Sequence, residues 1–327
     1  MSVDTKKELF SLEHVSKHFA VSGGTLKAVD NLSLKLYQGE AFGLVGESGC
    51  GKSTLGRLLV RLYQPSNGSI RFHGADISKL RRKAAKDYAF HVQMVFQESY
   101  SSLDPRMTIG DSIKEGMRIH HMGTEQEIDA RMYELLHLVG LNPEHASRFP
   151  YEFSGGQRQR AGIARALAVN PEFLVCDEPI SALDVSIQAQ IINLLKQLQT
   201  ELGLSYLFIS HDLSAVKYLT DRIGVMYLGS LVEVADTESL YLSPIHPYTQ
   251  ALLSAIPKAD PDVENTRERI VLEGDVPSPV NIGEGCKFCS RCQYCTEQCR
   301  QETPQLREIG QNHYVACCRA EELYHFE

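Results

Sequence analysis

The chain has 327 residues, 43% of them hydrophobic, so it can form a large buried core and extensive disorder is not expected. Its 33 basic residues are outnumbered by 41 acidic ones, and the net charge of −8 argues against a general nucleic-acid-binding protein. No apolar run approaches the roughly 20 residues of a membrane helix, and the first ten residues lack the apolar core of a signal peptide. We therefore expect a protein that remains in the cytoplasm.

Two segments near the beginning of the chain alternate apolar and polar residues, a pattern typical of antiparallel strands. They cover residues 12–19 and 26–36, and the pair Gly23-Gly24 between them predicts a turn. Phe19, at the end of the first segment, could stack its ring on a purine base. It could equally be a core phenylalanine, because one aromatic residue carries little signal by itself.

Residues 46–54 form a glycine-rich stretch that fits the phosphate-loop pattern of Gly, four residues, then Gly-Lys-Ser. An apolar run precedes it, as expected for a buried strand, and leucines at helical spacing follow it. A turn between strand and helix points backbone N–H groups inward, where they bind phosphate oxygens. We expect Lys52 to reach the β- and γ-phosphates of a nucleotide, and the Ser53 hydroxyl to bind Mg²⁺. The loop residues predicted to bind nucleotide are Gly46, Ser48, Gly49, Cys50, Gly51, Lys52, Ser53 and Thr54.

Two further strands are predicted at residues 69–72 and 92–96, and the second stops at Gln97. A polar amide at the carboxyl end of a strand lies where open α/β sheets bind ligands. Between about residue 99 and residue 150 the pattern becomes helical, with no strand signal. We therefore expect a helical insertion between two parts of the sheet domain.

The insertion ends at residues 153–157, Phe-Ser-Gly-Gly-Gln, which a helix-like segment follows. Ser154 is a candidate helix N-cap, and the paired glycines after it permit a close approach of the backbone. A helix start with free N–H groups and a serine hydroxyl can bind an anion, although it can also be a capped helix and nothing more. The residues of this candidate second anion site are Ser154, Gly155, Gly156 and Gln157.

The apolar run of residues 173–176 predicts a buried strand that delivers Asp177 and Glu178 to its carboxyl end. Asp177 is suited to hold the hydration shell of Mg²⁺, and Glu178 to polarise an attacking water. Residues 205–210 predict another central strand, which places His211 at the same edge of the sheet. There His211 could sense a γ-phosphate.

The last part of the chain differs in composition from the rest. Strands are predicted at residues 222–228 and 231–235, joined as a hairpin. From residue 243 onward prolines are frequent and periodicity is weak, so we expect an extension that does not continue the sheet. Seven of the nine cysteines lie between Cys286 and Cys318, and in a reducing compartment such a cluster indicates metal binding before disulfides. Of the other two, Cys50 and Cys176, we expect only small core residues.

Taken in order, these elements resemble the ATP-binding subunit of an ABC transporter. The elements that carry the resemblance are the phosphate loop, Gln97, residues 153–157, the strand ending at Asp177 and Glu178, the turn of residues 181–184, and His211. The resemblance implies an α/β fold: a RecA-like P-loop NTPase core with an antiparallel β subdomain, a helical subdomain and a cysteine-rich C-terminal extension. The implied divisions are residues 1–97 with 161–240 for the core, 98–160 for the helical subdomain, and 241–327 for the extension.

The motifs of the sequence are similar, more narrowly, to those of the oligopeptide/dipeptide importer branch of that family. The segments that share it are residues 46–50, 153–160, 177–185, 246–253 and 274–279. Nickel and glutathione importers share many of these motifs. Peptide is therefore the favoured substrate class, with nickel and glutathione as the alternatives. A soluble ABC ATPase with an iron–sulfur redox-sensing role is the alternative from another class.

In that family two ATPase chains face each other head to tail and hold each ATP between them. One chain supplies its phosphate loop and the other its signature serine and glycines, so the resemblance implies that closure assembles the site in trans. It further implies that Gln97 also binds Mg²⁺ and that Asp184 contacts the nucleotide. The implied partners are a second, different ATPase subunit, two transmembrane permeases and, indirectly, an extracytoplasmic peptide-binding protein, with no nucleic acid. The implied location is the cytoplasmic face of the cell membrane.

Related chains carry a C-terminal cysteine pattern that, in some of them, binds a [4Fe–4S] cluster. The pattern maps onto Cys286, Cys292, Cys299 and Cys317. All-thiolate ligation suits either an iron–sulfur cluster or zinc, and the resemblance favours the cluster. This chain departs from the pattern by adding Cys289, Cys295 and Cys318. The alternative quartet is Cys286, Cys289, Cys292 and Cys295, which would lie on one tight loop.

Overall fold

A computed structural model of the chain describes residues 7–98, 102–257 and 269–323. The chain divides into two compact units. The first unit contains Tyr37–Ala41 and Lys79–Ser210, and the second contains Glu8–Leu36, Phe42–Ser78 and the chain from His211 onward. Each unit is described by itself.

The first unit contains three parallel strands that are paired in the order β8-β7-β6. Their bounds are β6 (Val92–Val95), β7 (Phe173–Asp177) and β8 (Ser205–Ile209). Every residue of β7 and β8 is buried, which explains why both segments are continuous apolar runs. Because the strands are parallel, their carboxyl ends meet at one edge, and this confirms the predicted placement of Asp177 at the end of a central strand.

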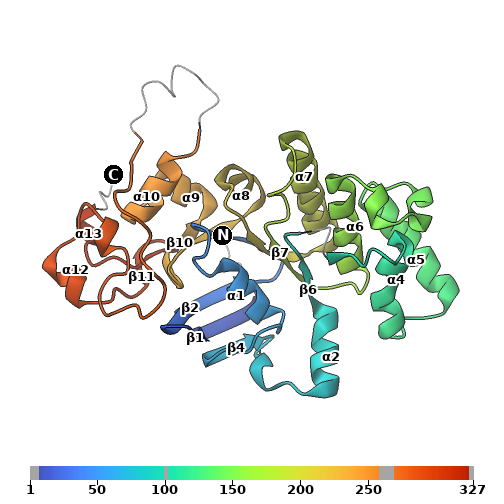
Figure 1. Cartoon of the computed structure of the whole chain (residues 1–327), viewed down its shortest axis with the longest axis horizontal. Helices are drawn as coiled ribbons and strands as arrows, with labels where there is room; N and C mark the ends of the chain where they lie inside the picture. The colour runs from blue at the N-terminus through green and yellow to red at the C-terminus, as the bar shows by residue number, and fades with distance from the viewer. Residues whose placement is uncertain (1–6, 99–101, 258–268, 324–327) are drawn as a thin grey trace, which may run out of the picture. The chain divides into compact units, whose positions relative to one another are not determined.

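The helices of the first unit include most of the predicted helical insertion (Figure 1). Their bounds are α2 (Arg82–His91), α4 (Ile109–Ile119), α5 (Glu125–Leu138), α6 (Gly155–Leu167) and α7 (Val185–Leu202), with short 3₁₀ turns at Pro143–Ser147 and Pro150–Glu152. Ile113 and Met117 of α4 are buried, as are Met132 and Leu135 of α5, in agreement with the helical periodicity. The predicted start of the insertion, near residue 99, lies outside the described residues.

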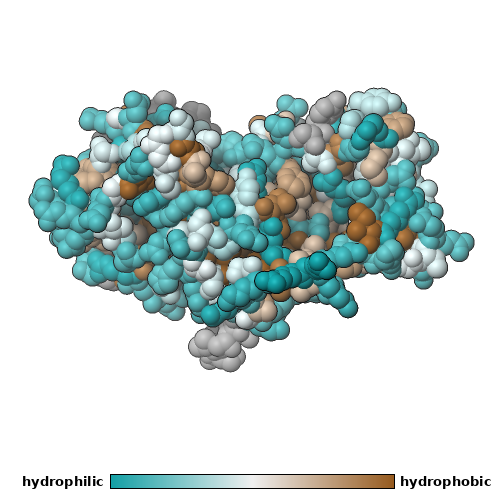
Figure 2. Space-filling model, turned by 60° about the horizontal axis from the view of Figure 1, so that its bottom comes forward, coloured by the Kyte–Doolittle hydropathy of each residue, from teal (hydrophilic) through white to brown (hydrophobic). Residues whose placement is uncertain are grey.

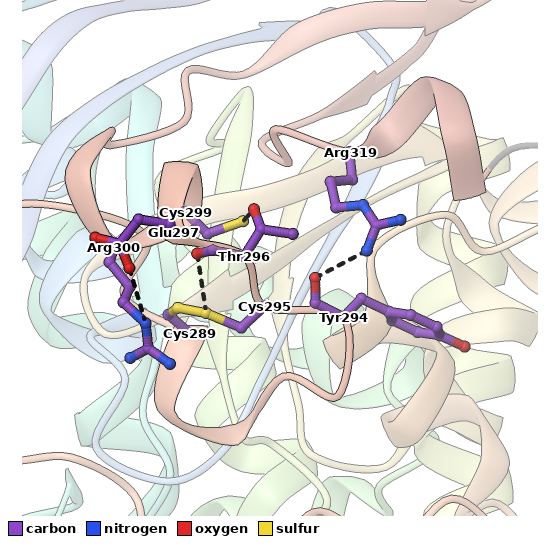
Figure 3. Close-up of a disulfide and its surroundings, with 8 residues drawn as sticks. All are labelled: Cys289, Tyr294, Cys295, Thr296, Glu297, Cys299, Arg300 and Arg319. Carbon is purple, nitrogen blue, oxygen red and sulfur yellow. Dashed lines mark hydrogen bonds and ion pairs between the residues drawn. A yellow bond between two sulfur atoms is a disulfide. The ribbon is translucent and has the colours of Figure 1, made fainter.

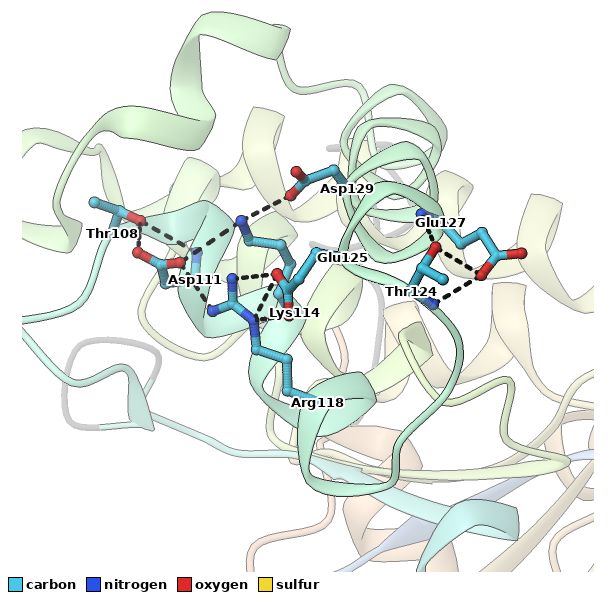
Figure 4. Close-up of polar contacts among 8 residues, drawn as sticks. All are labelled: Thr108, Asp111, Lys114, Arg118, Thr124, Glu125, Glu127 and Asp129. Carbon is cyan, nitrogen blue, oxygen red and sulfur yellow. Dashed lines mark hydrogen bonds and ion pairs between the residues drawn. The ribbon is translucent and has the colours of Figure 1, made fainter.

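Polar contacts tie α4 to α5 on the outside of this unit (Figure 4). Arg118 of α4 forms an ion pair with Glu125 at 2.8 Å, and Lys114 forms one with Asp129, also at 2.8 Å. Thr124 accepts a hydrogen bond from the backbone N–H of Glu127, and the Glu127 carboxylate accepts one from the backbone of Thr124, a reciprocal capping box. The start of α5 is therefore fixed by its own sequence.

The second unit begins with a four-stranded sheet in the order β2-β1-β4-β5. The bounds are β1 (Glu8–Val21), β2 (Gly24–Tyr37), β4 (Asn67–Phe72) and β5 (Ala75–Asp76). The two predicted N-terminal strands are present, and the turn that joins them lies at Ser22 and Gly23, one residue before the predicted Gly23-Gly24 pair, because Gly24 already begins β2. Phe19 is only half-buried, and its ring meets that of Tyr63 edge-on at 5.4 Å, so it is not a core phenylalanine.

A second set of strands in this unit runs in the order β11-β12-β10-β9-β3. The bounds are β3 (Ala41–Val45), β9 (Arg222–Tyr227), β10 (Ser230–Asp236), β11 (Arg307–Gly310) and β12 (His313–Val315). The β9–β10 hairpin is confirmed, with Ser230 opposite Tyr227. The expectation that the C-terminal extension does not continue the sheet is wrong, because β12 pairs antiparallel with β10 and places Val315 opposite Glu233.

The helices of the second unit are short. Their bounds are α1 (Lys52–Leu59), α8 (Leu213–Leu219), α9 (Thr237–Leu242), α10 (Pro247–Ser254), α12 (Glu297–Gln301) and α13 (Ala320–Leu323), with 3₁₀ turns at Ile77–Lys79 and Cys289–Arg291. In Figure 1, α12 and α13 lie in the red, C-terminal part of the chain beside β11. None of the helices within the described ranges is long and apolar enough to cross a membrane.

Hydrophilic residues predominate on the face that Figure 2 shows, and hydrophobic residues form small patches among them. Several large apolar side chains are nevertheless exposed, among them Val185, Leu242 and Tyr151. Scattered apolar residues of this kind are normal on a protein surface, so none of them by itself marks an interface.

Candidate functional site

The phosphate loop follows β3 directly and ends in α1, as its sequence predicts. Two of its glycines are required by the backbone. Gly46 has φ +149° and a Cβ there would lie 2.2 Å from the carbonyl oxygen of Met226, while Gly51 has φ +110° and a Cβ there would lie 2.0 Å from that of Ala28. The loop can therefore take this path only with glycine at both positions.

Lys52 is the first residue of α1, and its side chain folds back over the loop. Its ammonium group donates hydrogen bonds to the carbonyl oxygens of Gly46 at 2.8 Å and Glu47 at 2.9 Å, and its residue is only 4% exposed. The first turn of α1 contains no acidic residue, so nothing on the helix itself opposes an anion at its N-terminus. A buried ammonium and a helix start at one loop are suited to bind a phosphate group.

Glu47 of the loop is held by the C-terminal part of the chain, a feature that the sequence analysis missed. Its backbone N–H donates to the Tyr248 hydroxyl at 2.9 Å, and its two carboxylate oxygens accept from Nη1 of Arg291 at 3.1 and 2.9 Å. Tyr248 lies in one of the segments that resemble peptide importers, and Arg291 lies among the clustered cysteines. Nothing in either local pattern indicates a contact with the phosphate loop.

In the first unit, the structure brings Gln97 and Glu178 together beyond the carboxyl ends of β6 and β7. Nε2 of Gln97 donates a hydrogen bond to Oε2 of Glu178 at 2.9 Å. Glu178 has φ +46°, a conformation that non-glycine residues seldom adopt, and its backbone N–H is tied to the carbonyl of Ile209. The hydroxyl of Ser181 donates to the Glu178 carbonyl oxygen at 3.1 Å. The carboxylate is therefore fixed through its backbone, as is common at functional sites.

The neighbouring carboxylate has a different environment. Asp177 is only 2% exposed, whereas Glu178 is half-buried and Gln97 is exposed. Because one carboxylate is buried and its neighbour is more accessible, the two are suited to different chemical roles at the same strand end. Asp177 is suited to bind a cation or its water shell, and Glu178 is suited to accept a proton.

The predicted second anion site is a helix N-terminus, as its sequence indicates. Oγ of Ser154 accepts a hydrogen bond from the Gln157 backbone, and Oε1 of Gln157 accepts one from the Ser154 backbone, so both are used as a capping box. Gly156 has a packing role as well, because a Cβ there would lie 2.4 Å from Cγ2 of Ile187 in α7. Ser154 is exposed, and the first turn of α6 carries no acidic residue.

The remaining predicted residues stand at the ends of elements. Asp184 is the exposed N-cap residue of α7, and its carbonyl accepts the first hydrogen bonds of that helix. His211 is exposed and follows β8. The predicted nucleotide-binding residues are thus divided: Gln97, Asp177, Glu178, Asp184 and the Ser154–Gln157 stretch belong to the first unit, and Phe19, the phosphate loop and His211 to the second.

The clustered cysteines gather in the second unit around one small cavity of about 10 Å³. All seven line it, together with His246, Phe288 and Arg319. Cys289 and Cys295 form a disulfide (Figure 3), so the expectation of metal binding in place of disulfides does not hold for these two. The alternative ligand quartet would need both as thiolates, whereas the residues of the family quartet are all free thiols.

The thiols of that quartet differ in acidity. Burial raises the pKa of Cys286 to about 12 and that of Cys317 to about 11. Burial would also raise the pKa of Cys299, but hydrogen bonds from Thr296 and the charge of Arg319 outweigh it and lower the pKa. Among the described residues, no group of three or more His, Cys, Asp or Glu side chains is arranged to hold a single metal ion.

The other two cysteines are core residues, as expected. Cys50 is 4% exposed and Cys176 is fully buried, and burial raises the pKa of both thiols. Neither thiol is therefore suited to act as a nucleophile.

Comparison with known proteins shows the family to which the chain belongs. The chain matches the family described as ABC transporter over residues 29–181, and the one described as Oligopeptide/dipeptide transporter, C-terminal region, over residues 232–299. A solved structure, the dimeric post-hydrolysis state of the ATP-binding cassette MJ0796 bound to ADP and Pi, is similar with a TM-score of 0.65 and 28% identity, covering 70% of this chain and 99% of that one. The phosphate loop, the paired Gln97 and Glu178 and this fold define an ATP-binding cassette of the ABC type.

Two relatives match over nearly their whole length. The oligopeptide transport ATP-binding protein OppF of Bacillus subtilis (strain 168) is 52% identical over 317 residues, which cover 96% of this chain and 98% of that protein. The oligopeptide transport ATP-binding protein AppF of the same organism is 50% identical over 325 residues, covering 97% and 99%. The chain therefore belongs to the oligopeptide/dipeptide branch of the ABC transporter ATP-binding subunits.

Proposed function

We propose that this chain hydrolyses ATP to energise a membrane importer of oligopeptides. The observation that carries the proposal is the hydrogen bond between Gln97 and Glu178 beside the buried Asp177, in a chain that also has an intact phosphate loop. This combination supplies each group that phosphoryl transfer to water requires: a phosphate cradle, a cation site and a carboxylate that orients water. The names of the relatives favour oligopeptides as the transported class.

We propose the following roles for the residues of the chain. Lys52 binds the terminal phosphates of ATP, Glu178 accepts the proton of the attacking water, and His211 contacts the γ-phosphate. Ser53, Gln97 and Asp177 are hydroxyl, amide and carboxylate groups, the oxygen donors that Mg²⁺ prefers, and the ion would neutralise charge on the phosphates. Phe19 would stack on the base. These roles require that closure of a dimer completes each site with the partner's Ser154–Gln157 stretch and Asp184.

The partners follow from the same proposal. A second, different ATPase subunit would complete the dimer, and two permeases would hold it at the cytoplasmic face of the cell membrane. The core would consist of residues 1–97 and 161–240, the helical subdomain of residues 98–160 would meet the permeases, and residues 241–327 would form the extension. An extracytoplasmic peptide-binding protein would act on the chain only through the permeases.

Reconstitution tests this proposal. The chain, its partner ATPase, the two permeases and the binding protein are assembled in proteoliposomes, and phosphate release is measured. We expect ATP turnover to rise when the binding protein is loaded with an oligopeptide, since transport and hydrolysis are coupled. A rise in ATP turnover with nickel ions or glutathione in place of peptide would reassign the substrate. The same ATP turnover with and without the permeases would contradict a transport role.

We further propose that Cys286, Cys292, Cys299 and Cys317 bind a [4Fe–4S] cluster. The four are free thiols that line one cavity, and Arg319 beside it offers a positive charge to an anionic cluster. Because a cluster holds each thiolate on a different iron, its ligands can stand further apart than those of a single ion. The group would add structural stability to a segment with a small apolar core of its own.

Protein purified without oxygen tests the cluster. We expect a brown chain with visible absorbance and equal amounts of iron and acid-labile sulfide. Cys292→Ser should lose the colour, whereas Cys289→Ser, which alters a cysteine outside the quartet, should keep it. Colourless protein with stoichiometric zinc would contradict the proposal. Loss of colour in both variants would point to the other quartet.

A further inference from the structure

The segment of residues 286–292, here called the basic cysteine segment, contacts the nucleotide-binding part of the second unit through three side chains. Phe288 is 2% exposed and packs its ring against those of Tyr227 and Tyr248, with centroids 5.3 and 5.4 Å away. Lys287 and Arg291 flank it, and each reaches a carboxylate of a distant part of the chain. The segment is therefore held on the core by one aromatic anchor and two ion pairs.

Arg291 makes its ion pair with Glu47 at the start of the phosphate loop. The Nη1 to Oε2 distance is 2.9 Å, and the side chains are 8% and 27% exposed, so the pair is largely shielded from water. The Arg291 guanidinium also interacts with the Tyr227 hydroxyl, but Glu47 is the carboxylate with which it forms its ion pair among the described residues.

Glu47 has all of its polar groups fixed. Arg291 holds its carboxylate, the Tyr248 hydroxyl accepts from its N–H, and its carbonyl oxygen accepts from the Lys52 ammonium at 2.9 Å. The carbonyl also accepts a weaker hydrogen bond from the Cys50 backbone at 3.3 Å. A continuous chain of contacts thus runs from Arg291 through Glu47 to Lys52.

The second ion pair, between Lys287 and Asp30, supports the phosphate loop indirectly, through the turn that contains Gly229. The Lys287 ammonium contacts Asp30 at 2.9 Å, the Leu228 carbonyl at 2.9 Å and the Ser230 hydroxyl at 2.8 Å. Gly229, between these last two, donates its N–H to the Cys50 carbonyl at 2.9 Å. The basic cysteine segment thus supports the phosphate loop at two points.

We propose that Arg291 is a positioning residue for nucleotide binding: by fixing Glu47 it orients the phosphate loop and Lys52, so the basic cysteine segment sets the affinity of this chain for ATP. The inference rests on the proposed ATPase function and adds a role for the C-terminal part of the chain in it. A side chain that only stabilised the fold would change the melting temperature and leave the affinity for ATP as it was. The two roles are therefore separable by measurement.

The test uses the full chain and measures ATP binding with a fluorescent ATP analogue, together with KM and kcat for ATP hydrolysis. For Arg291→Ala we expect KM for ATP to rise about tenfold, equivalent to about 1.4 kcal/mol, with kcat changed much less. Arg291→Lys should recover part of the affinity, because it keeps the charge but loses the planar fork. Arg300→Ala is the matched control, since Arg300 is an exposed arginine of α12 that pairs only loosely with Glu297.

Glu47→Gln gives an independent arm of the test. It should raise KM for ATP as Arg291→Ala does, and the double variant should be no worse than either alone, because both remove the same contact. If Arg291→Ala does not fold, Arg291→Lys and Glu47→Gln, which keep side-chain volume, carry the test. A lower melting temperature with unchanged KM, or independent effects of the two substitutions, would overturn the inference. A wild-type chain that binds no ATP would overturn the proposed function itself.

Discussion

At the scale of single residues, Glu178 is the residue to which we assign the proton-accepting role, and its backbone conformation is unusual. The sequence predicts its role from two carboxylates after a buried strand, and Gln97 from an amide after the neighbouring strand. The sequence does not predict the direct contact between them at 2.9 Å, or the φ of +46° at Glu178, because both depend on how two strand ends meet. The structure thus adds geometry to residues that the pattern had already selected.

Replacing Glu178 with glutamine tests its role as the proton acceptor. The amide oxygen can still accept the hydrogen bond from Gln97, so the geometry should persist while the basic group is lost. We expect phosphate release to fall by about 10²–10⁴-fold, the usual contribution of a general base. ATP should still drive dimerisation, measured by light scattering. Glu201→Gln, at an exposed position at the end of α7, is the control, and normal turnover of Glu178→Gln would contradict the assignment.

At the scale of elements, long periodic or motif-bearing segments could be predicted and short strands could not. The helices α5 and α6 begin at N-caps that their sequences encode, and β7 and β8 are continuous apolar runs. The strands β11 and β12 have only four and three residues, too few for a clear alternation. The strand β12 forms because β10 offers it an edge, although the paired residues Glu233 and Val315 are 82 positions apart in the chain (315 − 233), and β11 in turn pairs with β12.

The close packing of α6 on α7 gives a prediction about Gly156. A methyl group at this position would clash with Cγ2 of Ile187, so we expect Gly156→Ala to lower the free energy of unfolding by about 1–3 kcal/mol. Urea unfolding measures it. Gly162→Ala in the same helix is the matched control, because a Cβ there meets nothing within 4 Å and the change should raise helix propensity.

Ile187→Ala combined with Gly156→Ala separates the clash from other effects. Removing Cγ2 should recover part of the lost stability, which would appear as a coupling free energy in a double-mutant cycle. Equal stability of Gly156→Ala and Gly162→Ala would mean that α6 and α7 can move apart at no cost. In that case glycine at position 156 would not be required for the packing of α6 on α7, and only the proposed contact with nucleotide would require it.

At the scale of the whole molecule, the C-terminal part is joined to the core by contacts that no local pattern contains. Arg291 and Glu47 are 244 positions apart, and His313 and Glu233 are 80 positions apart. Glu233 is fully buried, and its carboxylate accepts hydrogen bonds from the backbones of Ile245 and His246 and contacts His313 at 2.7 Å. A buried carboxylate needs such donors, so β10, β12 and the start of α10 are fixed together.

His246 makes this junction sensitive to acid. It is 2% exposed, its Nδ1 accepts a hydrogen bond from the Tyr248 backbone, and burial lowers its pKa to about 4, although the charge of Glu233 acts in the opposite direction. The unfolded chain binds this proton near pH 6.5, so the folded state favours the neutral ring. The stabilisation is therefore complete above about pH 6.5 and is lost as the pH falls toward 4.

Urea unfolding at pH 7.5 and pH 5.0 measures the effect of His246. Because its pKa shift favours the folded state only when the ring is neutral, this histidine should account for about 2 kcal/mol of the stability lost between the two pH values. His246→Asn should remove that share, since asparagine can still cap α10 with its side-chain oxygen but does not titrate. His137→Asn, at an exposed histidine of α5, should leave the loss unchanged. The same pH dependence in wild type and His246→Asn would show that His246 is not the source of the acid sensitivity.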